Sequence, residues 1–437
     1  MVKILFYKIT LLSSMLLILV MGLSSISAQE SQAEVTKAEI RKTNEGFRIF
    51  LNDELFYVKG VGAGESTDPA ELVRHGANAA RTWTTYNGKQ ILDLAHQYGL
   101  KVFMGIWLVP ERHGANYNDE NQVRAQYERV RKVVMELKDH PALFCWGLGN
   151  ELNLNASNLE VWNAVNDISK MIHELDPNHL TTTSLAGFES ELLEEIVKRA
   201  PDLDFISTQL YGPMDSFNEI ISKSVYKGPV LVTEWGATGY WEVPKTDWGA
   251  PIENHSSKKA DLYLSRYQNG ILKQSKQVMG SFAFLWGQKQ ERTPTWFGMF
   301  LADGTETEAI DVMHYAWKGT WPENRTPRLE AFSLDGKQPI DNIRLKVGQE
   351  YTAQVKVTDP DNDALIYKWV IMEESKSNKS GGDKEETPPE IKGLFNDDSG
   401  DTATFSAPAV SGAYRLFIYV YDGNNHAAHA NIPFFVE

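Results

Sequence analysis

Apolar residues in the first three quarters of the chain alternate between short buried runs and helical stripes. The run from Leu143 to Gly149 is almost wholly apolar, which is typical of a strand buried on both faces. Apolar side chains spaced by four and three positions predict a helix on either side of this run: Val123, Tyr127, Val130, Val134 and Leu137 before it, and Val161, Val165, Ile168, Ile172 and Leu175 after it. Strands that alternate with helices indicate parallel βα units.

This alternation continues through eight predicted strands. A hairpin formed by 47–51 and 55–58 is expected to lead into them. The runs predicted as strands are 57–61, 79–83, 101–107, 143–149, 180–184, 205–211, 229–234 and 280–286. Eight such units over residues 40–320 predict a (β/α)8 TIM barrel, a fold that carries its chemistry at the carboxyl ends of the strands.

The pattern changes at residues 321–327, where a proline near each end indicates a short, stiff linker. Beyond it the helical period disappears, and apolar residues alternate at period two in 351–357, 365–371 and 414–421. We therefore predict an α/β barrel followed by a small all-β immunoglobulin-like sandwich over residues 328–437. Its polar segment 375–389 is expected to be a mobile loop.

The first 28 residues have the features of a secretory signal peptide. Two lysines precede the apolar run 11–21, and small residues lead up to Ala28. An uncleaved membrane anchor is the alternative, but the run is short for a span. The single cysteine, Cys145, leaves none beside the cleavage site for a lipid and none for an intrachain disulfide. We expect a secreted or periplasmic protein without a membrane span after cleavage.

Charge and composition narrow the range of partners. A formal net charge of −15 argues against a nucleic-acid partner, because binding of phosphates requires a basic face. It does not argue against a neutral glycan. The chain has 12 Trp and 17 Tyr, whose flat rings are suited to stacking on sugar rings. Aromatic residues that fill the core are the alternative explanation for many of them.

Two glutamates stand at the ends of predicted barrel strands. Glu151 follows the fourth strand, and Glu234 ends the seventh. In a closed barrel both lie on the rim that carries the chemistry. Cleavage of a glycosidic bond requires two carboxyl groups, one protonated at neutral pH and the other ionised. The pair therefore indicates a glycosidase.

Two segments resemble the catalytic strands of clan A glycoside hydrolases with a family 2-type TIM barrel. They are 146–151, which reads WGLGNE, and 233–236, which reads TEWG. The resemblance implies that Glu151 is the acid/base and Glu234 the nucleophile of a retaining double displacement. It also implies substrate-binding roles for Arg81, Tyr211 and Trp286. Arg81 near Glu234 would hold it ionised, with a structural ion pair as the alternative role for this arginine.

The chain departs from family 2 β-galactosidases in two respects. Their extra N-terminal β domains have no counterpart, and the loop 62–66 lacks their histidine. Galactosidase specificity is therefore in doubt. A barrel with one C-terminal sandwich is more similar to bacterial endo-β-1,3-glucanases with a C-terminal Ig-like domain.

Further residues are expected to line the substrate cleft. Trp107 and Trp235 are candidates for stacking on sugar rings, as are Trp241, Trp248 and Trp296 in neighbouring loops, although some of these are expected to pack the loops instead. Asn150 is expected to bind the sugar 2-hydroxyl. His113 follows the third strand, and an exposed loop histidine is the equal alternative for it.

No zinc spacing, phosphate-binding loop or Ser-His-Asp signature is found, so neither a catalytic metal nor a cofactor is expected. The acidic turn 359–363 resembles calcium-binding turns, but an ordinary solvated turn is the favoured interpretation. The sequence thus predicts a secreted retaining glycoside hydrolase, with an endo-β-1,3-glucanase as the leading hypothesis. An exo-β-glycosidase, a glucanosyltransferase and a non-enzymatic glycan-binding protein are the alternatives.

Overall fold

A closed barrel of eight parallel strands forms the larger part of the computed structural model, which describes residues 34–64, 67–274, 276–379 and 382–437. The strands neighbour one another in the order β10-β11-β4-β5-β6-β7-β8-β9. Their bounds are β4 (Val58–Ala63), β5 (Ala79–Arg81), β6 (Lys101–Ile106), β7 (Leu143–Asn150), β8 (Leu180–Ala186), β9 (Phe205–Gln209), β10 (Val230–Trp235) and β11 (Val278–Trp286). The eight predicted strands are confirmed, and the expected signal peptide lies outside the described residues.

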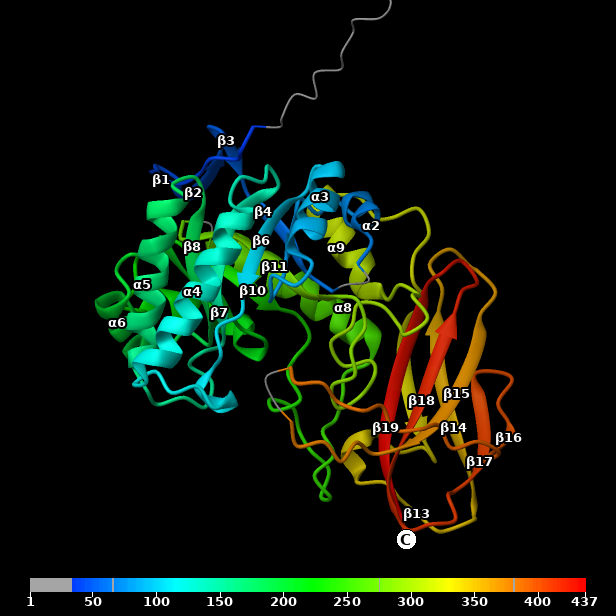
Figure 1. Cartoon of the computed structure of the whole chain (residues 1–437). Helices are drawn as coiled ribbons and strands as arrows, with labels where there is room; N and C mark the ends of the chain where they lie inside the picture. The colour runs from blue at the N-terminus through cyan, green and yellow to red at the C-terminus, as the bar shows by residue number, and fades with distance from the viewer. Residues whose placement is uncertain (1–33, 65–66, 275, 380–381) are drawn as a thin grey trace, which may run out of the picture. The chain divides into compact units, whose positions relative to one another are not determined.

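Helices surround this barrel, as Figure 1 shows. They are α2 (Pro69–Arg74), α3 (Gly88–Gln97), α4 (Glu120–Leu137), α5 (Glu160–Leu175), α6 (Ser190–Arg199), α7 (Phe217–Lys223), α8 (Ser256–Ser265) and α9 (Glu308–Lys318). Asp119 caps α4 by accepting hydrogen bonds from the backbone N–H groups of Asn121 and Gln122. In the described part of the chain, none of the helices is both long and apolar enough to span a bilayer.

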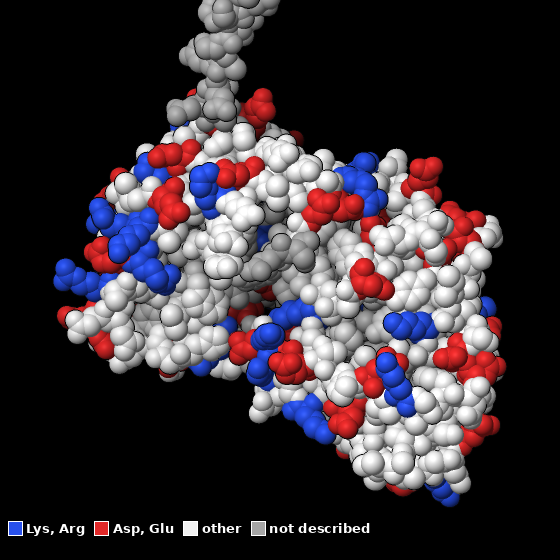
Figure 2. Space-filling view, turned by 45° about the vertical axis from the view of Figure 1, so that its right-hand side comes forward, with Lys and Arg blue, Asp and Glu red and all other residues white. Residues whose placement is uncertain are grey.

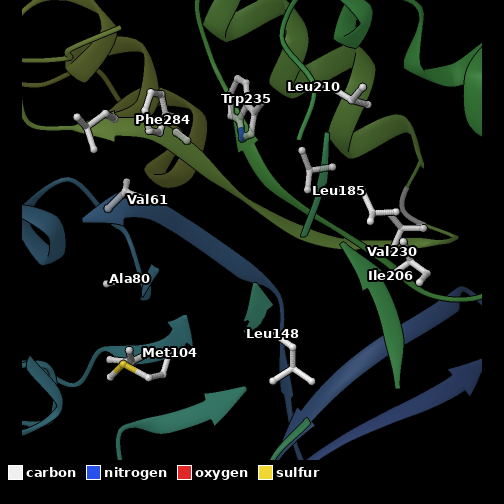
Figure 3. Close-up of a cluster of buried hydrophobic side chains, with 14 of the residues drawn as sticks. Val61, Ala80, Met104, Leu148, Leu185, Ile206, Leu210, Val230, Trp235 and Phe284 are labelled. Atoms are coloured by element: carbon white, nitrogen blue, oxygen red, sulfur yellow. The ribbon is translucent and has the colours of Figure 1, made fainter. Parts of the chain in front are cut away.

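The core lies between the barrel strands and these helices. Figure 3 shows part of it, with aliphatic side chains such as Val61, Leu148 and Val230 and the indole of Trp235. All four are inaccessible to solvent. Strands buried on both faces explain why their sequences are nearly continuous apolar runs.

A small sheet closes the amino-terminal end of the barrel. Strands β1 (Ala38–Thr43), β2 (Gly46–Leu51) and β3 (Glu54–Phe56) pair antiparallel, and the last two form the predicted hairpin. Ile49 and Leu51 pack against residues inside the barrel such as Phe103 and Phe144. The sequence did not predict β1, because it carries four charged or polar side chains among six residues. With this end covered, the carboxyl ends of the strands remain for a functional site.

Two four-stranded sheets follow the barrel and enclose a separate apolar core. One has the order β12-β14-β17-β16 and the other β13-β19-β18-β15. The strands are β12 (Arg328–Leu334), β13 (Arg344–Leu345), β14 (Glu350–Thr358), β15 (Ile366–Glu373), β16 (Phe395–Asp397), β17 (Thr402–Ser406), β18 (Gly412–Tyr421) and β19 (Ala427–Val436). The all-β prediction is confirmed for this part, and the immunoglobulin-like assignment stays a prediction.

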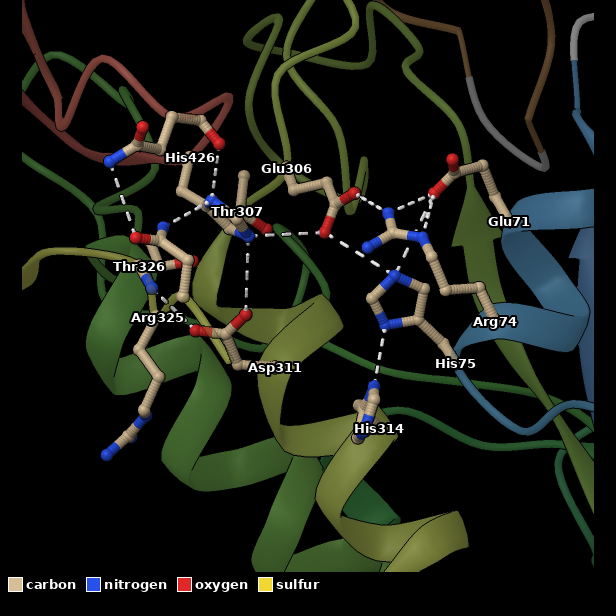
Figure 4. Close-up of polar contacts among 12 residues, drawn as sticks. Glu71, Arg74, His75, Glu306, Thr307, Asp311, His314, Arg325, Thr326 and His426 are labelled. Atoms are coloured by element: carbon tan, nitrogen blue, oxygen red, sulfur yellow. Dashed lines mark hydrogen bonds and ion pairs between the residues drawn. The ribbon is translucent and has the colours of Figure 1, made fainter. Parts of the chain in front are cut away.

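A buried polar cluster joins the barrel to these sheets (Figure 4). Glu306, in the loop before α9, accepts a hydrogen bond from Arg74 at 2.5 Å and lies 3.6 Å from His75 Nε2. On its other side it lies 3.4 Å from Nε2 of His426, which precedes β19. Asp311 on α9 accepts from the backbone N–H of Thr326 in the linker. Charges on the barrel are thus satisfied partly by groups of the sheets and the linker.

Asp311 in this cluster predicts a pH-dependent effect on stability. Burial raises its pKa to about 7, so folding favours the protonated form, and this stabilisation is lost as pH rises from about 4 through 7. Asp311→Asn keeps an acceptor for Thr326 and cannot ionise. Between pH 5 and pH 8.5 the unmutated chain should lose roughly 2–4 kcal/mol of unfolding free energy through Asp311, and Asp311→Asn should not lose it. The free energy of unfolding of the variant minus that of the unmutated chain should therefore be larger at pH 8.5 by this amount.

Urea unfolding at the two pH values measures this difference. The exposed Asp335, changed to Asn, is the matched control. A stability difference for Asp311→Asn that is the same at both pH values would contradict the prediction.

Candidate active site

A cleft of about 400 Å³ opens at the carboxyl ends of the barrel strands. Its walls come from loops that follow most of the strands, so residues far apart in sequence meet there. The lining side chains that bear on the chemistry are Trp83, Trp107, Asn150, Glu151, Tyr211, Glu234, Trp241, Phe284, Glu291 and Asp383. This is the position in which barrels of this type carry functional residues.

Glu234, near the end of β10, is held by three donors. Arg81 Nη1 donates to its Oε1 at 2.6 Å, and Trp83 Nε1 donates to the same oxygen at 2.7 Å. The hydroxyl of Tyr211 donates to Oε2 at 3.0 Å. Glu234 is only 6% exposed, so these contacts are made largely out of water. One cation and two neutral donors fix the orientation of the Glu234 carboxylate.

Asn150, the last residue of β7, is oriented by the same arginine. Its Oδ1 accepts from Arg81 Nη2 at 2.7 Å and from Gln209 Nε2 at 2.7 Å. Both donors use the amide oxygen, so the amide nitrogen is left to donate into the cleft. Arg81 thereby links two residues of the cleft through one guanidinium group.

Glu151 follows Asn150 in a backbone conformation that turns the chain sharply. Its φ is 49°, and that of Gly149 is 77°, so two left-handed residues lie at the end of β7. The Glu151 N–H donates to Ser184 O at 2.8 Å, and its C=O accepts from Arg112 Nη1 at 2.7 Å. These bonds hold the strained turn and place the carboxyl group in the cleft.

Burial raises the pKa of Glu151 to about 7, and the negative charge of nearby Glu234 contributes to the rise. Glu151 therefore holds a proton at neutral pH to a far greater extent than an exposed glutamate. Glu234, in contrast, faces Arg81 directly. The two carboxyl groups are thus placed in different environments within one cleft, which separates an acid from a base.

Glu291 is a third carboxyl group in the cleft and was not predicted. It lies in the loop after β11, is 5% exposed, and pairs with Lys289 at 3.1 Å. Burial raises its pKa, while Lys289 opposes the rise. The sequence offered no signal for it, because the loop has no regular period.

The structure brings most of the predicted site residues together. Glu151, Glu234, Asn150, Tyr211 and Trp107 all line the cleft. His113 lies beside Trp107, with ring centroids 5.9 Å apart, and its Nε2 is 3.4 Å from Oδ1 of Asp383.

Three residues predicted to bind substrate do not line the cleft. Trp235 is fully buried and packs on Tyr267 in the layer between barrel and helices. Trp286 is 1% exposed and packs against Trp317, so neither indole reaches the cleft. Arg81 is also 1% exposed and positions Glu234 and Asn150 from behind the cleft surface, so its predicted place beside Glu234 is confirmed while a direct substrate contact is not seen.

Other aromatic residues occupy the cleft instead. Phe284 lies on the wall where Trp286 was expected, and Trp83 contacts it edge to face at 5.8 Å. Trp83 stands two positions after Arg81, and in the predicted strand 79–83 a period of two places both on the same side, although β5 itself ends at Arg81. That spacing was the available signal for Trp83. Trp241 is 51% exposed at the rim, whereas Trp296 is buried.

Trp83→Phe tests the contribution of the indole N–H to Glu234. Phenylalanine keeps an aromatic ring against Phe284 but removes the 2.7 Å hydrogen bond. A hydrogen bond to a charged group contributes about 1.5–3 kcal/mol, so we expect kcat for any reaction that uses Glu234 to fall roughly 10- to 100-fold. The melting temperature, measured in parallel, should change little. Unchanged kcat would show that the indole is only a packing group.

The barrel is similar to known glycoside hydrolases. Residues 48–242 match the family model described as "Glycosyl hydrolases family 2, TIM barrel domain". The chain is 35% identical over 125 residues to mannan endo-1,4-β-mannosidase F of Aspergillus clavatus, covering 24% of this chain and 28% of the relative. It is 23% identical over 330 residues to β-glucuronidase of Chlorocebus aethiops, covering 66% of this chain and 44% of the relative. The chain thus spans less than half the length of these relatives.

Solved structures show the same fold. A β-glucuronidase of Ruminococcus gnavus superposes with a TM-score of 0.51 at 18% identity, covering 65% of this chain and 53% of that chain. A β-glucuronidase of Bacteroides uniformis superposes with a TM-score of 0.50 at 15% identity, covering 92% of this chain and 48% of that chain. At these identities the likeness concerns the fold alone.

Proposed function

We propose that this chain, a glycoside hydrolase whose barrel is of the glycosyl hydrolase family 2 type, is a secreted retaining enzyme that cleaves a β-linked glycan. The observation that carries the proposal is the pair of unlike carboxyl groups in one cleft. Glu234 accepts three hydrogen bonds, one of them from Arg81, while the pKa of Glu151 is raised to about 7. A nucleophile and a general acid need these two environments.

In the proposed reaction, Glu234 attacks the anomeric carbon as Glu151 gives its proton to the departing glycosidic oxygen. The C–O bond to the leaving sugar breaks, and an ester between the glycosyl unit and Glu234 forms. Glu151, now ionised, removes a proton from water, which attacks the same carbon and releases Glu234. Asn150 donates to the sugar hydroxyl beside the reacting carbon. In the second step Glu234 is the leaving group, and its carboxylate is kept oriented by Arg81, Trp83 and Tyr211.

The proposed substrate is a neutral β-glycan, with β-1,3-glucan as the leading choice and cleavage inside the chain. Trp107 and Trp241 at the rim offer aromatic faces for sugar rings. On the face shown in Figure 2, acidic and basic side chains are interspersed, and neither sign forms one continuous field. Such a surface favours an uncharged polymer over a polyanion.

An exo-acting β-glycosidase is the second candidate, because two of the relatives are named β-glucuronidase and β-galactosidase. The glucanosyltransferase alternative requires only that a sugar hydroxyl replaces water in the second step. Secretion remains a proposal that rests on the signal-peptide pattern in residues 1–28.

A substrate panel tests these proposals. It contains β-1,3-glucan, β-1,4-glucan, β-mannan, and the nitrophenyl β-glucuronide and β-galactoside. We expect oligosaccharides of several lengths to be released from β-1,3-glucan, with the β-anomer appearing first by NMR. Release of single sugars alone would favour the exo-acting candidate. Products longer than the substrate would indicate a glucanosyltransferase. Binding without turnover of any substrate would overturn the enzyme proposal.

A further inference from the structure

A second hollow of about 460 Å³ lies next to the candidate active site. It is bounded on one side by the barrel loop 240–251 and on the other by edges of the C-terminal sheets, at 373–376 and 410–414. The two hollows have Trp241 in common, since this residue lines both of them.

A chain of aromatic contacts leads from the catalytic carboxylate to this second hollow. Tyr211, which donates to Glu234, meets Trp241 edge to face with ring centroids 5.6 Å apart. Trp241 meets Tyr240 in the same way at 4.8 Å. Tyr240 lines the second hollow, and the guanidinium of Arg292 lies 4.7 Å above its ring. Tyr211 alone therefore stands between Glu234 and Trp241, the first residue of the second hollow along this path.

The walls of the second hollow are tied together. Arg415 of β18 is 1% exposed and donates to both carboxylate oxygens of Glu374, at 2.7 and 2.9 Å. The same guanidinium donates to Pro251 O at 2.9 Å, across to the barrel loop. Nearby, Asn431 of β19 donates to the buried Glu253 of that loop at 2.6 Å. A buried arginine that bonds to both walls makes the hollow a preformed site.

Residues 379 and 382–385 follow the wall residues 373–376 in the chain, and they connect the second hollow with the catalytic cleft. Tyr240 donates to Lys379 O at 3.3 Å, and the backbone N–H of Arg292 donates to Glu385 at 2.9 Å. Lys289 donates to Gly382 O at 2.7 Å, and Asp383 lines the cleft. The sheets thus contribute to the wall of both hollows.

The lining chemistry fits sugar rings. Trp241 supplies an exposed aromatic face, while Ser411 and the exposed Glu373 and Lys376 supply hydrogen-bonding groups at the edge. Lys376 pairs with Glu373 at 2.9 Å, which offsets the charge of both. Aromatic faces with mixed donors and acceptors bind hydroxyl-rich rings without requiring a charged ligand.

We propose that this second hollow is a distal glycan-binding site, built jointly by the barrel and the C-terminal sheets, that holds rings of the same β-glycan whose reacting bond lies between Glu151 and Glu234. The proposal rests on the proposed function for the identity of the ligand, and on the shared Trp241 for the continuity of the chain. It gives the C-terminal sheets a role in recognising long substrates.

Ser411→Trp tests the site by filling the hollow from its exposed rim. The measured quantity is the gain in kcat/KM from a β-1,3-linked disaccharide to the octasaccharide. We expect this gain to fall about tenfold in the variant, the effect of losing one or two ring contacts. Ser399→Trp, an equal change at an exposed turn of the same sheets, is the matched control and should keep the gain.

A binding measurement separates failure of this inference from failure of the proposed function. Calorimetry of Glu234→Gln with soluble β-1,3-glucan is compared with and without Ser411→Trp. Weaker binding in the double variant supports the distal site even if the unmutated chain cleaves nothing. Cleavage or binding that is insensitive to Ser411→Trp overturns the distal site and leaves the catalytic proposal intact. Absence of both binding and cleavage overturns both proposals for this glycan.

Discussion

Replacing Glu234 by glutamine is expected to lower kcat about 10⁴- to 10⁶-fold, the range seen when a nucleophile is removed from an otherwise intact site. The amide still accepts hydrogen bonds but carries no charge to stabilise the developing positive charge at the anomeric carbon. The three donors to Glu234 then face a weaker acceptor. Binding of substrate should change far less than turnover, so the loss should appear in kcat.

A second substitution separates loss of the nucleophile from loss of the fold. Glu234→Ala leaves space below the sugar ring, into which a small anion such as azide can diffuse. With an activated aryl β-glycoside, azide attacks the anomeric carbon directly and the α-glycosyl azide should form. Glu54→Gln, an exposed carboxylate on β3 at the other end of the barrel, is the matched control. Turnover by Glu234→Gln close to that of the unmutated chain would show that the nucleophile is another group.

The barrel was predictable because its strands and helices have distinct periods. Runs buried on both faces, such as 143–149, stand between helical stripes, and the end of each run places a residue on the rim. This reasoning predicts the positions of Glu151 and Glu234 at the ends of β7 and β10. The same logic, applied one residue further, would have excluded Trp235. Neighbouring residues on a strand point to opposite sides, so the residue after an inward Glu234 faces the helices.

The remaining errors have physical causes outside local sequence patterns. The register between β11 and β4 shifts between Ala283 and Trp286, so counting along β11 does not give the direction of its last side chains. Phe284 takes the wall of the cleft for this reason, and Trp286 packs in the core. Asp383 reaches the cleft from a polar loop of the C-terminal sheets, a contact between residues remote in sequence. Only the folded arrangement brings it there.

The raised pKa of Glu151 predicts the alkaline limit of activity. A general acid must be protonated in the free enzyme, so kcat/KM should fall as pH rises through about 7. This alkaline limb of the pH profile should move if a cause of the raised Glu151 pKa is removed. Burial is the larger cause and persists in any variant that folds. The charge of Glu234 is the second cause, so in Glu234→Gln the pKa of Glu151, followed by NMR, should fall while remaining above 4.5.

The effect of the Glu234 charge on the pKa of Glu151 also gives Glu151 its two roles. Once the glycosyl ester forms, Glu234 carries no charge, the pKa of Glu151 falls, and the group becomes able to act as a base toward water. Glu151→Gln should therefore lower kcat for oligosaccharides about 10²- to 10⁴-fold and abolish the alkaline limb. Dinitrophenyl β-glycosides, whose leaving group needs no proton, should still give a rapid first burst of phenolate followed by slow turnover. An unaltered pH profile in Glu151→Gln would assign the acid to another residue, with Glu291 the next carboxyl group in the cleft.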